Sequence, residues 1–209
     1  MRKCCRKDSA IMKKMDIEEL FARIREYPQE GYAVLLPLIE TENGWSVLFE
    51  VRSPSISQGG EVCFPGGKIE NGESAEEAAV RETCEELLVS PEQIDMLTPL
   101  PDRLSSPHKV YAFAAVLKEY SFTFSKEETE KVFAVPLETL LKEEPLVADT
   151  DRPYRFPEDF PFDLLPGGKD YPFRVRREPI YFYCNEEILI WGLTANILHT
   201  FLEIVRSPK

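Results

Sequence analysis

The chain has 209 residues and a formal net charge of −12 at pH 7, with 43% hydrophobic and 11% aromatic residues. This length predicts one domain with decorations, and the apolar content allows a sizeable core. The negative charge argues against nucleic acid or an anionic membrane as a partner. No apolar run approaches the roughly 18–20 residues that span a bilayer.

The N-terminal segment and the cysteines indicate the compartment. Residues 1–14 are basic, lack the continuous apolar segment of a signal peptide and are expected to form a flexible tail, followed by a helix from Asp16 to Pro28. The cysteines form an odd set without C-x-x-C spacing: Cys4, Cys5, Cys63, Cys84 and Cys184. The last three lie in expected strands or helices, which favours reduced, buried thiols and a cytoplasmic location.

Two apolar segments, 32–39 and 45–51, predict the strands of a hairpin, because Asn43-Gly44 between them is a strong turn signal. The loop 52–60 follows and begins with Arg52 and Ser53. Its length favours a segment that faces a substrate, since functional residues concentrate on such loops. Turn chemistry alone would also produce the proline and glycines found there.

The stretch 61–89 predicts a strand, a glycine loop and a helix, in that order. The strand ends at Phe64, Pro65-Gly66-Gly67 interrupts it, and Ser74 followed by Glu77 is the signature of a capped helix start. Helical spacing predicts a core-facing side made of Val80, Thr83, Cys84 and Leu87. The opposite side is expected to carry Glu82, Glu85 and Glu86, with Ala78 and Ala79 leaving room there for a ligand.

Three carboxylates within about one helical turn repel one another, at roughly 0.2–0.5 kcal/mol per like-charged pair. An acidic helix face is usually a solvated face, but a divalent cation would remove the repulsion. Carboxylate oxygens suit Mg²⁺ or Mn²⁺, which take one or two carboxylates, waters and substrate phosphate oxygens. Arg81 beside the cluster is expected to orient Glu73 in the preceding loop.

The second half of the chain alternates between expected strands and helices. Its expected elements are strands at 94–100, 110–117, 132–135, 180–184 and 188–191, a helix with Pro136 in its first turn, and an amphipathic helix at 193–205. An acidic loop, 125–129, precedes the third of these strands. Of the two histidines, His108 has no assigned role and His199 is expected to be structural.

The segment 146–177 is rich in proline, aromatic residues and arginine, and it is too long for an ordinary connection. One alternative is an irregular loop that covers a hydrophobic sheet. The other is a lid or a dimer arm that supplies aromatic and cationic contacts to a nucleotide. The composition suits both.

The glycine loop and acidic helix together resemble the Nudix box, in which a glycine is followed after five residues by Glu and after seven more by Arg-Glu-U-x-Glu-Glu-x-Gly-U, with U a large apolar residue. The matching positions are Gly67, Glu73, Arg81, Glu82, Glu85, Glu86 and Val89. Thr83 stands at an apolar position of the pattern and Leu88 at its last glycine. The resemblance implies an α/β/α sandwich with a mixed sheet between helices, formed by residues 16–209 as one domain. It also implies hydrolysis of a nucleoside diphosphate linked to another group.

The same resemblance assigns roles to individual residues. Glu82 and Glu86 would be the principal ligands of Mg²⁺ or Mn²⁺, with Glu85 completing the site directly or through water and the Gly66 carbonyl contributing. Arg81 and Glu73 would hold this geometry from behind the ligands. Glu128, in the acidic loop, would act on the attacking water or on a further metal.

A narrower resemblance concerns the substrate. Residues 47–53 leading to 60–67, and residues 190–198, look like the coenzyme A pyrophosphatase branch, which implies substrate binding by Arg52, Ser53, Gly66 and Gly67. The loop is one residue short, and Ser57 falls near a second arginine of that branch.

For coenzyme A or an acyl-coenzyme A, the products of this branch would be 3′,5′-ADP and the (acyl-)4′-phosphopantetheine. The alternatives are a hydrolase of ADP-ribose, another nucleotide sugar or a dinucleotide, and a non-catalytic nucleotide sensor. A homodimer is an expectation from the family.

Overall fold

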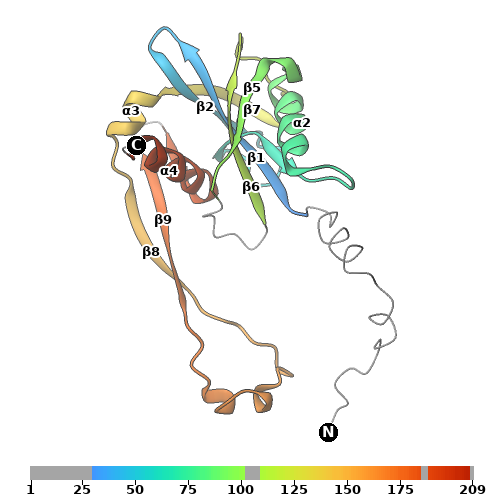
Figure 1. Ribbon diagram of the computed structural model, residues 1–209, viewed down its shortest axis with the longest axis vertical. Coiled ribbons are helices and arrows are strands. Elements are labelled where there is room, and N and C mark those ends of the chain that lie inside the picture. Colours follow the sequence, from blue (N-terminus) through green and yellow to red (C-terminus); the bar gives the residue numbers. More distant parts are fainter. Residues whose placement is uncertain (1–29, 102–108, 185–187, 208–209) are drawn as a thin grey trace, which may run out of the picture.

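The computed structural model describes residues 30–101, 109–184 and 188–207 (Figure 1). The expected tail at 1–14, the helix from Asp16 to Pro28 and His108 lie outside the described residues.

A mixed, seven-stranded sheet forms the centre of the molecule. Its path runs β3-β2-β1-β6-β5, with β4 paired to β1 and β7 paired to β2. Only the β1–β6 pair is parallel among the pairs of this sheet in the described chain. The strands are β1 (Tyr32–Thr41), β2 (Gly44–Arg52), β3 (Val62–Cys63), β4 (Gly66–Lys68), β5 (Ile94–Pro99), β6 (Val110–Leu117) and β7 (Thr129–Pro136).

The predicted hairpin is confirmed, with Thr41 opposite Gly44 and Gly44 in the left-handed region at φ 85°. A glycine adopts this conformation without the steric penalty of a side chain.

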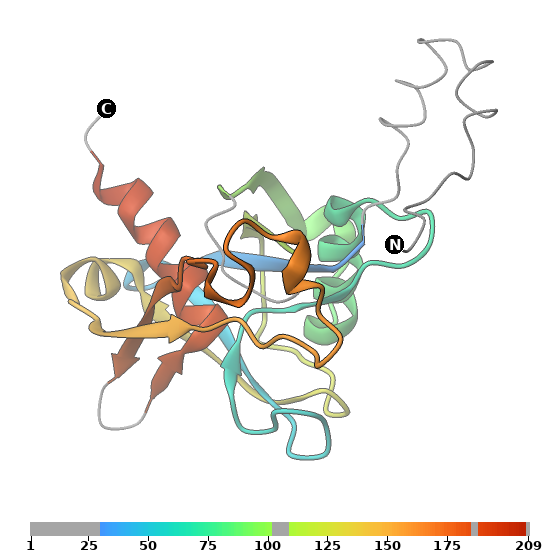
Figure 2. The same cartoon turned by 90° about the horizontal axis from the view of Figure 1, so that it is seen from below.

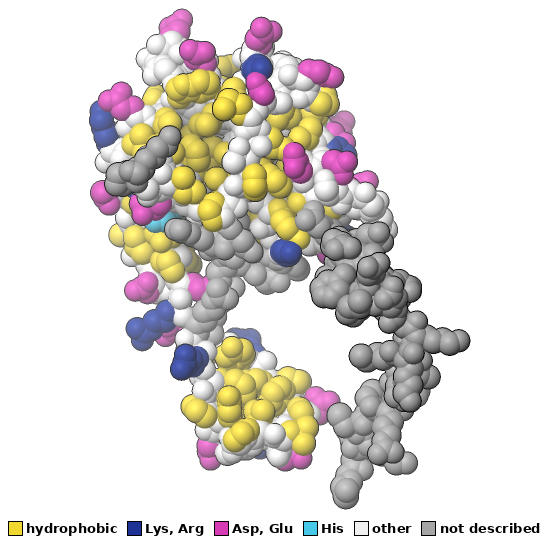
Figure 3. Space-filling view, in the orientation of Figure 1, with side chains coloured by type: hydrophobic (Ala, Val, Ile, Leu, Met, Phe, Trp, Pro, Cys, Tyr) yellow, Lys and Arg dark blue, Asp and Glu magenta, His cyan; other side chains and the backbone are white. Residues whose placement is uncertain are grey.

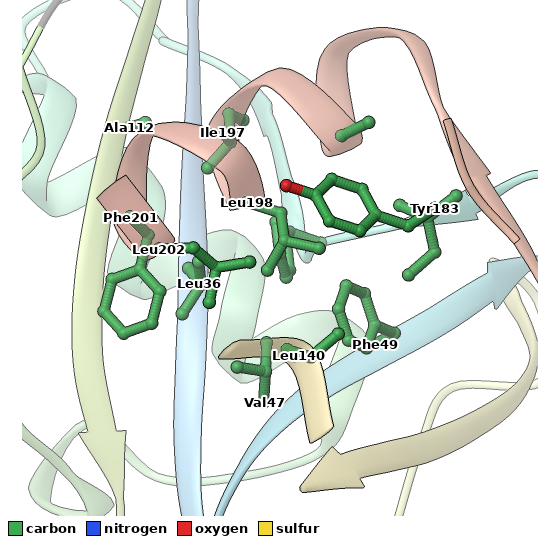
Figure 4. Close-up of a cluster of buried hydrophobic side chains, with 13 residues drawn as sticks. Leu36, Val47, Phe49, Ala112, Leu140, Tyr183, Ile197, Leu198, Phe201 and Leu202 are labelled. Carbon is green, nitrogen blue, oxygen red and sulfur yellow. The ribbon is translucent and has the colours of Figure 1, made fainter. Parts of the chain in front are cut away.

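Helices cover both faces of this sheet (Figure 1). On one face, Ala33 and Leu35 of β1 pack against α2 (Ala75–Leu87). On the other, Leu36 packs in a cluster with α3 (Leu137–Lys142) and α4 (Gly192–Arg206), which Figure 4 shows. Successive residues of a strand point to opposite faces, so β1 contributes to both layers. The predicted α/β/α sandwich with a mixed sheet is confirmed.

A second sheet has the order β10-β9-β8, formed by β8 (Leu146–Arg152), β9 (Arg176–Cys184) and β10 (Leu189–Trp191). Its longest part is an antiparallel ribbon in which Leu146 pairs with Phe182 and Arg152 with Arg176. The alternative that 146–177 is an irregular loop is therefore wrong at both ends of the segment. Because most side chains of β8 are exposed, this strand shows no alternation of buried and exposed residues that could have revealed it.

The ribbon ends in a tip, residues 153–175, with two short 3₁₀ turns at Phe162–Leu164 and Gly168–Asp170. Six rings pack on one another there, with centroids 4.5–6.4 Å apart: Tyr154, Phe156, Phe160, Phe162, Tyr171 and Phe173. Figure 3 shows the tip as a separate apolar cluster beyond the body, and Figure 2 shows it from below in front of the body. The tip is thus an arm and does not cover the sheet.

The cysteines are less buried than expected. Cys184, expected in a core, is exposed at the end of β9, while Cys63 and Cys84 are half-buried; all three are free thiols. None of the described helices is long and apolar enough to cross a membrane.

Candidate active site

The start of α2 has the predicted cap. The Glu77 N–H donates to Ser74 Oγ at 3.2 Å, and the Ser74 N–H donates to Glu77 Oε2 at 2.8 Å. Both bonds satisfy amide groups that a helix start leaves without partners. They fix where the helix begins and thereby where Glu82 and Glu86 emerge from it.

The buried side of α2 differs from the prediction. Ala75, Ala78 and Ala79 are buried against the sheet, and Glu86 lies among the buried residues with an exposed fraction of 3%. Val80 and Cys84, expected in the core, are half-buried and face an outer surface. The alanines and Glu86 follow one helical stripe, so the small residues bring the helix close to the sheet and carry Glu86 inward with them.

The glycine loop reaches the carboxylates directly. The Gly66 N–H donates to Glu86 Oε2 at 2.8 Å. A Cβ on Gly67 would lie 2.3 Å from the Glu82 carboxyl, so a side chain at this position would displace that group. Pairing of β4 with β1 holds both glycines in place. The structure therefore brings together Gly66, Gly67, Glu82 and Glu86, which the family resemblance had grouped.

Arg81 and Glu73 form the predicted pair. Arg81 Nε donates to Glu73 Oε1 at 2.9 Å and Nη2 donates to Glu73 Oε2 at 3.1 Å, a bidentate contact. Nη1 donates to Glu82 Oε1 at 2.7 Å and to Glu85 Oε2 at 3.2 Å, and Nη2 also reaches the Lys68 carbonyl. The hydrogen bond from Arg81 lowers the pKa of Glu73. One guanidinium thus ties the loop to two carboxylates of α2.

Glu50 was not predicted and is the most buried carboxylate near the site, with an exposed fraction of 1%. It lies on β2 and accepts hydrogen bonds from Cys63 Sγ and Thr129 Oγ1, both at 3.2 Å. Alternation along β2 places it on the same face as Leu48, which packs with Leu87 of α2. A single acid within the apolar run Val47–Val51 was the available sequence signal.

The buried carboxyls are electrostatically unfavourable to one another. Burial raises the pKa of Glu50, and burial followed by the charge of Glu50 raises the pKa of Glu86. Burial likewise raises the pKa of Glu82, although its hydrogen bond from Arg81 acts in the opposite direction. The charge of exposed Glu128 also raises the pKa of Glu82 and of Glu86, as the smallest of the contributions named.

The donor set fits a hard divalent cation. In the described part of the chain, neither Glu50 nor Glu86 forms an ion pair with lysine or arginine. No three acidic, histidine or cysteine side chains among the described residues come close enough to enclose a metal by themselves. Mg²⁺ and Mn²⁺ suit such a half-open set, because water and phosphate oxygens complete their coordination. Glu82 and Glu86 would hold the ion, and Glu85, more exposed, lies at the edge of the set.

Glu128 lies in the loop before β7, and Ser53 is hydrogen-bonded to that loop. The Ser125 N–H donates to the Glu86 carbonyl at 2.8 Å, which ties this loop to the end of α2. The Ser53 N–H donates to the Glu128 carbonyl at 2.8 Å. Ser53 is buried, its hydroxyl pairs with Ser55 Oγ at 2.8 Å, and it lines neither of the two cavities described below.

Two cavities border the glycine loop and α2. The outer groove, of about 970 Å³, runs along the exposed side of α2 and is lined by five glutamates beside Arg81. The inner cavity, of about 530 Å³, is lined by β1, the segment from Arg52 to Phe64, Gly66, Gly67, the start of β6, the end of β10 and the start of α4. Although the outer groove is larger, its glutamates repel a phosphate. The inner cavity has Arg52 in its wall and is the better substrate site.

Comparisons with known proteins find relatives of this chain. A family model described as "NUDIX domain" matches residues 30–156. "Nudix hydrolase 3" of Caenorhabditis elegans is 28% identical over 180 residues, which cover 83% of this chain and 72% of that protein. "Uncharacterized Nudix hydrolase NudL" of Enterobacter sp. (strain 638) is 27% identical, covering 84% of this chain and 83% of that protein. A solved "Nudix Hydrolase from M. Smegmatis, RenU" is 24% identical at a TM-score of 0.46, covering 52% and 71% of the two chains.

Proposed function

The chain belongs to the Nudix hydrolase family, and we propose that the pyrophosphate bond it hydrolyses is that of coenzyme A or an acyl-coenzyme A. The products would be 3′,5′-ADP and the (acyl-)4′-phosphopantetheine. A Nudix pyrophosphohydrolase acts on a nucleotide-type small molecule, so the proposal concerns which nucleotide is taken.

One observation carries the proposal. The two segments that resemble the coenzyme A pyrophosphatase branch are more than a hundred residues apart, yet they line the same inner cavity. The first contributes Arg52, Gly66 and Gly67, and the second contributes Trp191 and Thr194. Thr194 Oγ1 donates to the Val62 carbonyl at 3.1 Å, which joins the two segments directly.

The residues of the chain divide the chemistry among them. Arg81 and Glu73 orient the carboxylates of α2. Gly66 and Gly67 leave room for the phosphates of the substrate to approach these carboxylates, and Arg52 offers positive charge in the cavity wall. Glu128, in the loop that is tied to the end of α2, would accept a proton from the attacking water. Pyrophosphate cleavage concentrates negative charge on phosphoryl oxygens, so positioning and charge stabilisation are the main tasks.

A Mg²⁺ or Mn²⁺ ion at Glu82 and Glu86, supported by Glu85 and the Gly66 carbonyl, would neutralise this charge and acidify water. Arg52 in the cavity wall would hold the substrate, and Glu128 would act on the attacking water. A homodimer is part of the proposal.

A hydrolase of ADP-ribose, another nucleotide sugar or a dinucleotide is the second candidate. Ser57, near the position of a second arginine in the coenzyme A branch, favours it: the Ser57 carbonyl accepts a hydrogen bond from Arg52 Nε at 3.0 Å. With its Nε occupied by the loop, Arg52 has fewer donors for a phosphate of coenzyme A.

Product analysis tests the proposal. The protein is incubated with Mg²⁺ or Mn²⁺ and, separately, coenzyme A, acetyl-coenzyme A, ADP-ribose and a dinucleotide, and products are identified by mass spectrometry. Release of 3′,5′-ADP at the highest kcat/KM supports the coenzyme A assignment. Preferential release of AMP from ADP-ribose would refute it.

The control is Glu86→Gln, which keeps an acceptor for the Gly66 N–H but removes the charge. We expect it to lose about 10²–10³-fold in kcat, equivalent to several kcal/mol of lost charge stabilisation. Nucleotide binding without turnover in both proteins would instead indicate a sensor.

A further inference from the structure

The rim of the inner cavity carries large apolar side chains that remain exposed to solvent. Tyr32, Trp191 and Leu193 each have between 39% and 42% of their surface exposed, and all three line this one cavity. They come from β1, β10 and the first turn of α4, so three elements converge to present them. Exposed apolar surface gathered around a cavity in an acidic protein indicates a ligand site.

The same walls offer polar groups of both kinds. Arg52 can donate, Glu61 can accept, and Gln58 can do either. The amide groups of a pantetheine chain can also use these donors and acceptors, but that chain has no flat face to lie against an aromatic ring. A nucleobase needs flat rings against its faces and a mixture of donors and acceptors along its edge. The lining therefore suits an aromatic base better than a chain of methylene and amide groups.

We propose that the inner cavity binds the nucleobase of the substrate, with the indole ring of Trp191 as the surface on which the base stacks. This assignment rests on the pyrophosphatase function proposed above. Gly66 and Gly67 form the part of the cavity next to Glu82 and Glu86. A base held against Trp191 directs its phosphates past these glycines toward the carboxylates. Trp191 is thus a specificity-determining residue at the nucleoside end of the substrate.

Neighbouring contacts hold Trp191 ready for this role. It pairs with Phe182 across the β9–β10 ladder, and the two rings are nearly parallel, at 6°, with centroids 6.4 Å apart. A ring whose orientation is already fixed loses little freedom on binding. The second sheet, remote from the acidic helix in sequence, thereby contributes to the substrate site through its last strand.

The chain offers a direct optical test, because it has two tryptophans. Trp45 is exposed to a similar degree, 46% against 42%, and lies near the start of β2, about 23 Å along the strand from Arg52. Trp45→Phe leaves Trp191 as the only indole, and Trp191→Phe leaves Trp45. Each variant is titrated with AMP, 3′,5′-ADP and 4′-phosphopantetheine, with Mg²⁺ and with EDTA. None of these probes contains a pyrophosphate bond, so none is consumed by the proposed reaction.

The expected result is saturable quenching by AMP or 3′,5′-ADP in Trp45→Phe and none in Trp191→Phe. Quenching by 4′-phosphopantetheine alone would show that the cavity takes the chain, and the assignment would fall. Absence of quenching in Trp45→Phe, while the wild type hydrolyses a substrate, would also overturn it. Quenching by nucleotide in a protein that hydrolyses no substrate would refute the proposed function and leave the cavity assignment standing.

Kinetics give a second readout. Trp191→Ala should raise KM about 5- to 150-fold, the loss expected for one stacking surface, and leave kcat within about twofold. Trp191→Phe should restore KM to near the wild-type value, because phenylalanine keeps a ring. A fall in kcat with unchanged KM would contradict a role in base binding.

Discussion

Glu50 and Glu86 are two buried carboxyl groups, and the charge of Glu50 contributes to the raised pKa of Glu86. Burial raises the pKa of both groups above the value near 4.5 of an unfolded chain. Between that value and the raised folded pKa, the native state binds more protons than the unfolded state. Stability from this pair is therefore fully present below about pH 4.5 and is lost as the pH rises through the folded pKa values.

Glu50→Gln should make the metal-free protein more stable at pH 8–9 and flatten the decline of its melting temperature from pH 5 to pH 9. Each extra proton held by the native state changes the free energy of unfolding by up to about 1.4 kcal/mol per pH unit. Thermal denaturation in EDTA across this pH range measures the effect. Glu130→Gln removes an exposed carboxylate beside Thr129 and serves as the control. Equal slopes for the two variants would show that Glu50 keeps its charge without cost.

Arg81→Lys should lower kcat about 10- to 100-fold, because lysine cannot reproduce the bidentate contact to Glu73 while also bonding Glu82. Steady-state kinetics with the best substrate of the panel give the value. Arg206→Lys is the matched control. Arg206 also donates to several groups, the carbonyls of Leu140, Leu141 and Glu143, but it lies on α4, away from the candidate site on α2. A similar fall in kcat for both variants would mean that general destabilisation, not positioning, is responsible.

At the scale of elements, the end of α2 contains a testable departure from the family pattern. Leu88 adopts the left-handed conformation, with φ 55° and ψ 46°, where the pattern has glycine. A side chain in this conformation costs about 1–2 kcal/mol. Leu88 is 60% exposed, so part of its apolar surface still stabilises the fold.

Comparing Leu88→Gly with Leu88→Ala separates these two effects, since both variants lose the apolar surface and only glycine relieves the strain. We expect the glycine variant to be more stable than the alanine variant by about 1 kcal/mol in urea unfolding. If alanine were equally or more stable, the left-handed conformation would carry no cost at this position.

Elements with local signals were predictable, and elements defined by their surroundings were not. The start of α2 was predicted because Ser74 and Glu77 cap it through contacts within one turn. Its buried side was not, because hydrophobic spacing favoured Val80 and Cys84 over the alanines that approach the sheet. β8 escaped prediction because its exposed side chains leave backbone pairing with β9 as its main determinant.

The site shows the same division. The proximity of Glu82, Glu86, Arg81 and Glu73 was predictable from their spacing in the sequence, because they lie on one helix and on the loop that leads into it. Glu50 belongs to a strand that reaches α2 only through the tertiary fold, so its role depends on the register of β2. The contribution of Trp191 likewise requires the second sheet to meet the first.

At the scale of the whole molecule, the arm is connected to the body by the β8–β9 ribbon, and its rings pack mainly on one another. Such a tip should be removable without loss of the sandwich, since it adds little to the core between the sheet and α4. Arg152 and Arg176 lie opposite each other in the ladder. An Asn-Gly turn between them can therefore replace residues 153–175 and close the ribbon as a short hairpin.

The shortened protein should melt within about 4 °C of the full chain, which corresponds to roughly 1 kcal/mol for a protein of this size. Phe201→Ala, which removes one buried ring from the body, is the sensitivity control. It should cost about 3–5 kcal/mol and lower the melting temperature by roughly 6–20 °C. Loss of a single aromatic side chain from the body would then matter more than loss of six from the arm. A fall as large as that of Phe201→Ala would mean that the tip supports the fold. Light scattering on the full chain and on the shortened protein reports whether the arm also holds the proposed homodimer. If it does, removing the arm would halve the molecular mass of the particle in solution.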